Sequence, residues 1–79
     1  MVIIKNIVKK NFYRDSVQLL HLSEEAKKLP GVIDAAIVMG TKLNKELLEK
    51  QGLLTDEGRS ASDNDMIIAV KIEDSANLE

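Results

Sequence analysis

The chain contains no cysteine, a single proline and only two aromatic residues, Phe12 and Tyr13, among its 79 residues. Without cysteine it can form neither a disulfide framework nor a thiolate metal site, so packing or oligomerisation must hold its core together. Its longest apolar runs have about five residues, whereas about 20 are needed to span a bilayer. Met1–Lys10 lacks the apolar centre and cleavage site of a signal peptide, so the sequence predicts a cytoplasmic protein without a membrane segment.

Length and composition predict one small globular domain. With 44% apolar and 30% charged residues the chain is too apolar to stay disordered, and 79 residues are too few for a second domain. The net charge is −2, but the acids crowd the last third of the chain, whereas four cations precede the first acid: Lys5, Lys9, Lys10 and Arg14. The overall acidity and the shortage of stacking aromatic residues argue against nucleic acid as a partner.

Three segments have strand patterns. Val2–Lys10 is rich in β-branched residues and should have one buried and one half-exposed face. Asn6 falls on the otherwise apolar face, so we expect it at the rim of the core or bonded to a backbone group. The other two strands are expected at 32–39 and 66–73, the latter as the central strand. Its clean apolar face, Met66, Ile68, Val70 and Ile72, should be the more buried one, with Ile67 and Ala69 partly buried on the other.

A first amphipathic helix is predicted over 15–29. Asp15 is a suitable N-cap because its carboxylate can accept hydrogen bonds from free N–H groups of the first turn, and Gln18 completes a capping-box spacing. Pro30 ends the helix because it cannot continue the hydrogen-bond ladder. The expected buried stripe consists of Leu19, Leu22, Ala26 and Leu29.

A second amphipathic helix is predicted over 42–51, with Thr41 as its N-cap and Gly52 at its end. Leu53 and Leu54 can fold back on the last turn. The following stretch, 55–65, is polar and predicts a solvent-exposed loop with one helical turn at 55–58.

The order strand, helix, strand, helix, strand favours an α+β fold. Two amphipathic helices can cover one face of a three-stranded sheet, which gives a two-layer sandwich. If the helix at 42–51 only elaborates a connection, strands 32–39 and 66–73 pair antiparallel, and the whole is a ferredoxin-like or ACT-like βαβ(α)β domain lacking its last strand. The alternative is a small three-stranded parallel α/β fold. A helix cap at Asp74 or Ser75 would start a further, truncated helix.

The junction between the second strand and the second helix is the first candidate site. Gly40 followed by Thr41 at a helix N-terminus exposes free N–H groups that suit phosphate or carboxylate, and Lys42 would add positive charge. A single Gly-Thr pair is a much weaker signal than a full glycine-rich phosphate loop. Capping alone accounts for Thr41, and the residues favour that structural role.

No catalytic residue, metal site or cofactor is predicted. His21 is expected on the exposed side of the first helix, without the nucleophile or orienting carboxylate that general-base catalysis needs. Ser16 and Ser23 are better explained as first-turn and surface residues than as nucleophiles. The oxygens of Asp63, Asn64 and Asp65 lack the further ligands of a calcium loop, so these three residues are interpreted as turn formers.

Three residues are candidates for an interface. Of Phe12 and Tyr13, which directly precede the first helix, one should pack over the helix start and the other should lie at a rim or an interface. Arg59 could bind a carboxylate or phosphate of a partner domain, although a solvated loop arginine is the commoner outcome.

Three segments together resemble the N-terminal domain of the FdrA family: NFYRDSVQLLHLS (11–23), GVIDAAIVMGTKLNKELLEKQGLL (31–54) and NDMIIAV (64–70). The most specific parts are Asp15-Ser16-Val17 at the helix start, Met39-Gly40-Thr41 with Asn44, and Asn64-Asp65 before the last strand. The resemblance implies a ligand-binding or docking role for the Gly40-Thr41 turn and Asn44.

The resemblance also implies that the chain is a piece of a longer protein. The remainder of FdrA proteins is similar to NDP-forming acyl-CoA synthetases, related to the succinyl-CoA synthetase subunits, and FdrA-like proteins are associated with oxamate carbamoyltransferase in allantoin catabolism. None of the synthetase-like segments falls within these 79 residues, so no catalytic residue carries over.

The expected function is therefore that of a non-catalytic accessory or assembly domain of an FdrA-like protein. Its partners would be other domains or subunits of that complex, or a second copy in a homodimer, with a small anion as a further candidate and no membrane. The alternative is a free-standing ACT-like module that dimerises through a sheet edge and senses a small acid at Gly40-Thr41. A small enzyme that uses His21 is the least favoured hypothesis.

Overall fold

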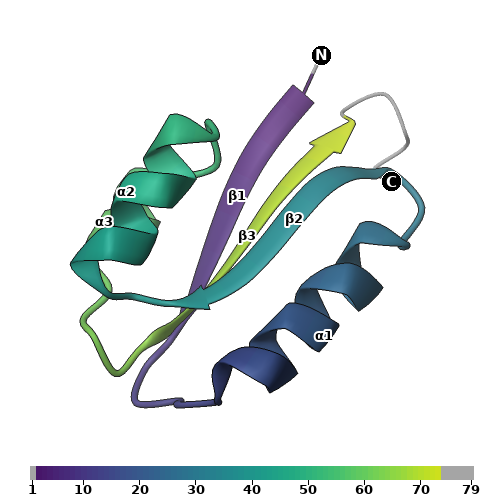
Figure 1. The fold of residues 1–79 in the computed structure, drawn as a ribbon. Helices are drawn as coiled ribbons and strands as arrows, with labels where there is room; N and C mark the ends of the chain where they lie inside the picture. Colours follow the sequence, from purple (N-terminus) through teal and green to yellow (C-terminus); the bar gives the residue numbers. More distant parts are fainter. Residues whose placement is uncertain (1, 74–79) are drawn as a thin grey trace.

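The computed structural model describes residues 2–73 and contains one three-stranded sheet flanked by helices (Figure 1). The predicted helix cap at Asp74 or Ser75 lies outside the described residues. The elements in chain order are β1 (Val2–Lys9), α1 (Ser16–Lys27), β2 (Val32–Met39), α2 (Lys42–Lys50), α3 (Asp56–Arg59) and β3 (Met66–Glu73). Within residues 2–73, no helix combines the length and the apolar character that a membrane span requires.

The sheet has the strand order β1-β3-β2, and β3 pairs antiparallel with both neighbours. β1 and β2 therefore run in the same direction, are joined through α1, and have β3 between them. This is the ferredoxin-like βαβ arrangement, so the predicted α+β class, the antiparallel pairing and the central place of β3 are confirmed. The parallel α/β alternative is wrong.

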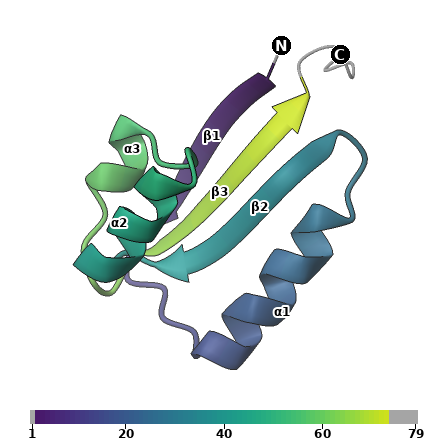
Figure 2. The same ribbon diagram turned by 45° about the horizontal axis from the view of Figure 1, so that its top comes forward.

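The helices lie on opposite faces of the sheet rather than on one, so the expected two-layer packing is wrong (Figures 1 and 2). On one face, residues of α2 and of the segment before β3 pack on Ile67 and Ala69. On the other face, α1 packs on Ile37 and Met66. Successive residues of β3 point to opposite faces, and Ile67 and Ala69 are fully buried, so both faces carry apolar residues that need a cover.

The start of α1 is as predicted, since the Asp15 carboxylate accepts a hydrogen bond from Gln18 N at 3.0 Å. Its buried side differs from the predicted leucine stripe. Leu19 and Ser23 are buried, whereas Leu29 is 58% exposed and lies beyond the last helical residue. The cause is that α1 packs chiefly against the edge strand β2. A single strand contacts only a narrow strip of the helix surface.

The segment after α2 is anchored more firmly than a solvent-exposed loop would be. Leu53 folds back as predicted, with its N–H donating to Leu48 O at 2.8 Å, and its side chain is buried. The predicted turn at 55–58 is present as α3. Asn6, buried in β1, donates to Leu53 O at 2.8 Å and accepts from Thr55 N at 2.7 Å, so it satisfies backbone groups as one of its two predicted roles.

Candidate functional site

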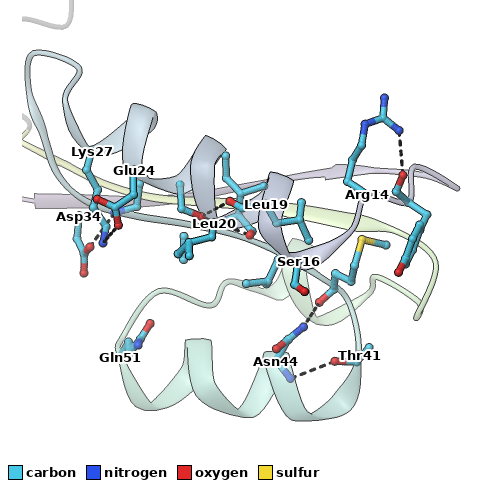
Figure 3. A pocket seen from close by; sticks show the side chains of 17 residues that line it. Arg14, Ser16, Leu19, Leu20, Glu24, Lys27, Asp34, Thr41, Asn44 and Gln51 are labelled. Atoms are coloured by element: carbon cyan, nitrogen blue, oxygen red, sulfur yellow. Dashed lines mark hydrogen bonds and ion pairs between the residues drawn. The ribbon is translucent and has the colours of Figure 1, made fainter.

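A groove of about 620 Å³ follows the outer edge of β2 between α1 and α2 (Figure 3). Residues 34–39 of β2 form its floor. Residues of α1 form one wall, and Asn44 and Gln51 face it from the side of α2. It contains Thr41 and Asn44, two of the residues that the sequence proposed for ligand binding, and is therefore the candidate site.

The floor of the groove is the unpaired edge of the sheet, and side chains cap most of its outward-facing backbone groups. Ile37 N donates to Ser23 Oγ at 2.8 Å, which places the N–H and C=O groups of every second residue of β2 away from β3. Asp34 Oδ1 accepts from Ala35 N at 2.9 Å, at one end of this edge. Such caps compete with a further strand for the edge and so disfavour strand addition there.

The other end of the edge is closed by Asn44. Its side-chain amide donates to Met39 O at 3.0 Å, while its backbone N–H donates to Thr41 Oγ1 at 3.2 Å. The role of Thr41 as N-cap of α2 is therefore confirmed. Each side chain thus makes a hydrogen bond that stabilises the fold, which accounts for its presence without a ligand.

Charged side chains of both signs lie at the two ends of the groove. At one end, Lys27 Nζ lies 3.6 Å from Glu24 Oε2, and Asp34 lies close by (Figure 3). At the other end, Arg14 donates to Tyr13 O at 2.9 Å and its guanidinium lies 4.0 Å from the centre of the Phe12 ring. The groove thus has no excess of one sign that would select an anion or a cation.

The structure separates the four residues predicted to bind an anion. Lys42 is exposed and lines a different, smaller groove with Lys45 and Arg59. Gly40 is buried, donates its N–H to Asp65 O at 2.8 Å, and leaves room for no Cβ, which would lie 2.6 Å from Ser62 O. Anion binding at this junction stays a prediction, with Thr41 and Asn44 as the members that line the groove along β2.

Asp65 is a buried residue whose importance the sequence did not reveal. Its carboxylate accepts hydrogen bonds from Ser62 N and Asn11 N, both at 2.9 Å, and lies 3.7 Å from Lys10 Nζ. These contacts, the Ser62 backbone first and the Asn11 backbone next, lower the pKa of Asp65 from 3.8 to about 2, although burial opposes the shift. Asp65 is a turn former, as expected, and it also ties the β1–α1 connection to the start of β3.

The predicted interface residues have different environments. Phe12 is half-buried against the cluster around Leu19, whereas Tyr13 is exposed, so each takes one of the two expected roles in packing. Arg59 is paired within the chain, at 3.0 Å from Asp56 and 3.2 Å from Glu49. Their participation in an interface stays a prediction.

The remaining candidates do not form a catalytic group. His21 is exposed and is not part of the groove, whereas Ser16 lines it. The expectation that Ser23 is a surface residue is wrong: it is buried and its hydroxyl is used between α1 and β2.

Comparisons with known proteins found a matching family and a longer relative. The model of one family, described as "AllF, heavy metal-associated domain", matches residues 1–79. The uncharacterized protein YahF of Escherichia coli K12 is 40% identical over 76 residues, which cover 96% of this chain but 15% of YahF. The chain thus spans about a seventh of the curated relative that it matches. No solved structure matches the chain significantly.

The word "metal" in the family's description calls for a test against the donors of this chain. Soft metal ions select thiolate ligands, and the sequence has no cysteine. His21 is the single histidine, and residues 2–73 contain no group of three or more His, Asp or Glu side chains placed to hold an ion. The donors of the described residues do not fit a heavy-metal ion.

Proposed function

The chain belongs to the AllF heavy metal-associated domain family, and we propose that it serves as a non-catalytic accessory domain of a longer protein. The observation that carries this proposal is the coverage: nearly all of the chain aligns with YahF, yet the aligned region is 15% of that protein. A domain of this size contributes to a longer protein chiefly through contacts with other domains or subunits.

The chemistry of the described residues supports the proposal. Three of the polar side chains that line the groove, those of Ser23, Thr41 and Asn44, are bonded within the fold. His21, the one histidine, is exposed on α1 away from the groove. An acid–base catalyst needs a partner at hydrogen-bond distance from the reacting group, and this groove offers structural contacts instead.

A finer form of the proposal rests on the resemblance to the FdrA family. We propose that the longer protein is FdrA-like, with a part of the NDP-forming acyl-CoA synthetase type, and that it acts with oxamate carbamoyltransferase in allantoin catabolism. In that setting this domain would help to assemble the complex. The ACT-like sensor module stays an alternative prediction, and the capped edge of β2 would leave the edge of β1 for its dimerisation.

The test uses the full-length protein that carries this domain. Residues 2–73 are deleted, and the mass of the assembled complex is measured by light scattering together with oxamate carbamoyltransferase turnover. The matched control adds the 79-residue chain back in trans. We expect the deletion to reduce the assembled mass while turnover per correctly assembled complex is kept, and the added chain to restore assembly.

Two results would contradict the proposal. If the purified 79-residue chain catalyses the reaction, the domain is not accessory. If the deletion abolishes turnover and leaves the assembled mass unchanged, the domain contributes to the chemistry rather than to assembly. Loss of assembly without any carbamoyl transfer in the intact protein would reject only the FdrA-like form of the proposal.

A further inference from the structure

The two faces of the central strand are covered unequally. On the face that meets α2, Ile67 and Ala69 are fully buried. On the opposite face, Ile68, Val70 and Ile72 of the same strand are only half-buried. An antiparallel sheet that leaves one face to water normally carries polar residues there, so an apolar row that is only half-buried marks a face that lacks part of its cover.

The lack of cover is confined to the part of this face formed by β1 and β3. α1 lies beside β2 (Figures 1 and 2), and the cluster around its Leu19 extends to β3 only at Met66 and Ile68. The register places Ile3 opposite Ile72 and Ile7 opposite Ile68, so both belong to the same face. Ile7 is 52% exposed. We call this surface the open face; its apolar members are Ile3, Ile7, Ile68, Val70 and Ile72.

The open face has the dimensions of one α-helix. Each strand occupies about 4.8 Å of the sheet, so β1 and β3 together are about 10 Å wide, which is also the width of a helix with its side chains. β1 has eight residues and so is about 26 Å long, which matches a helix of about 18 residues. A helix in this position would lie beside α1 on the same side of the sheet.

The charge of the open face is one-sided. The register places Lys5 opposite Val70 and Lys9 opposite Met66, so both lysines project from this face, and both are exposed. On the described strands β1 and β3, no acidic residue shares the face with them. Lysines beside an apolar strip select a partner with carboxylates along its flank.

We propose that the open face binds an acidic amphipathic helix. Apolar residues of that helix at i, i+3, i+4 and i+7 would cover the isoleucines and valine, and its aspartates or glutamates would pair with Lys5 and Lys9. The inference rests on the proposed accessory role and names the chemistry of the partner through which this domain would act.

The test measures the binding of a labelled helical peptide to the 79-residue chain by fluorescence anisotropy. The probe has about 18 residues, a leucine stripe at helical spacing and glutamates on both flanks. The matched probe carries lysines in place of the glutamates. We expect the acidic peptide to bind, its affinity to fall as salt is raised, and the basic peptide to bind at least tenfold more weakly.

Variants of the chain locate the binding surface. Ile7→Thr should weaken binding about tenfold because it removes apolar contact area, and Lys5→Glu and Lys9→Glu should each weaken it roughly two- to fivefold. The control Leu43→Thr changes an exposed leucine on α2, on the other side of the sheet, and should leave the affinity unchanged.

A second readout is the protection of a single cysteine from alkylation, which is measured at one saturating peptide concentration. Because the chain has no cysteine, Ile7→Cys and Leu43→Cys each create a single alkylation site. A saturating amount of the acidic peptide should slow alkylation at position 7 and leave position 43 unchanged. Equal effects at both positions, or none at either, would overturn the proposal.

Other occupants give other results. If the chain forms a dimer in sedimentation experiments and Ile7→Thr disrupts it, a second copy covers the open face and the helix proposal is wrong. Failure of the acidic peptide to bind would also overturn it. Neither result touches the accessory role, which is tested separately by deletion of residues 2–73 from the full-length protein.

Discussion

Ser23 of α1 and Ile37 of β2 are joined by a buried hydrogen bond, in which Ile37 N donates to Ser23 Oγ at 2.8 Å. The hydroxyl can donate in turn to Leu19 O, 2.9 Å away within the helix, or to Ile37 O at 3.4 Å. One hydroxyl thus satisfies a backbone donor at the edge of the sheet and fixes the distance between helix and strand. This contact caps the edge of the sheet midway along the floor of the groove.

Replacement of Ser23 by alanine should destabilise the fold by about 1–3 kcal/mol, because Ile37 N–H would be left buried without an acceptor. The control is Ser60→Ala, which removes an exposed hydroxyl that bonds to Glu57 O within one turn, and should change stability by less than about 0.5 kcal/mol. Urea unfolding followed by circular dichroism measures both. Equal effects of the two substitutions would contradict a structural role for the Ser23–Ile37 bond.

The role of Ser23 could not be predicted from the sequence because helical periodicity is counted on apolar residues. The leucine pattern pointed to a broad stripe that includes Leu22 and Leu29, which would suit a helix lying flat on a sheet. α1 instead packs along an edge strand, where a short side chain with an acceptor can reach an outward-facing N–H group. Whether a helix packs on the edge or on the face of a sheet is a tertiary property, and residue spacing does not encode it.

Local signals were more informative. The caps at Asp15 and Thr41 and the fold-back of Leu53 were predicted because each depends on residues that are neighbours in sequence. The same holds for the strand bounds. The buried carboxylate of Asp65 was hidden in a polar stretch, since its partners Asn11 and Lys10 come from the other end of the chain.

Acid should destabilise the fold partly through Asp65. Its pKa is lowered from 3.8 to about 2 in the folded protein, so its stabilising contribution is complete above about pH 4 and is lost as the pH falls towards 2. We therefore expect the free energy of unfolding to decrease with falling pH in this window. Asp65→Asn should lower stability at pH 7 and flatten the dependence between pH 4 and pH 2.

The exposed neighbour Asp63 provides the control for this experiment. Asp63→Asn removes the same charge two positions away, and should leave both the stability at pH 7 and the shape of the pH profile nearly unchanged. Urea unfolding at several pH values measures the three proteins. A profile of Asp65→Asn that follows the parent down to pH 2 would show that other carboxylates carry the acid sensitivity.

Gly58 should tolerate no larger residue while Asn6 is present. A Cβ at position 58 would overlap Asn6 Oδ1 and lie 2.8 Å from Leu54 Cδ1. Gly58→Ala is expected to cost about 1–3 kcal/mol. Because the clash is with Asn6, the double variant with Asn6→Ala should lose less stability than the sum of the two single variants.

Gly31 provides the control for this double-mutant cycle of Gly58→Ala and Asn6→Ala. It has φ +84°, so Gly31→Ala should cost about 1–2 kcal/mol through backbone strain, in a different turn. Its effect should add to that of Asn6→Ala within about 0.5 kcal/mol. Additivity in the Gly58 cycle as well would mean that the space around Asn6 does not limit position 58.

Stoichiometric Zn²⁺ should not raise the melting temperature of the 79-residue chain. A ligand that binds only the folded state must stabilise it, and tight zinc sites use three or four thiolate or imidazole donors. The sequence offers no thiolate and one imidazole, that of the exposed His21. Differential scanning fluorimetry with and without a chelator measures the effect, with His21→Ala as the control. A shift that survives in His21→Ala would mean that carboxylates of this chain bind the ion, and that the donor set fits a metal after all.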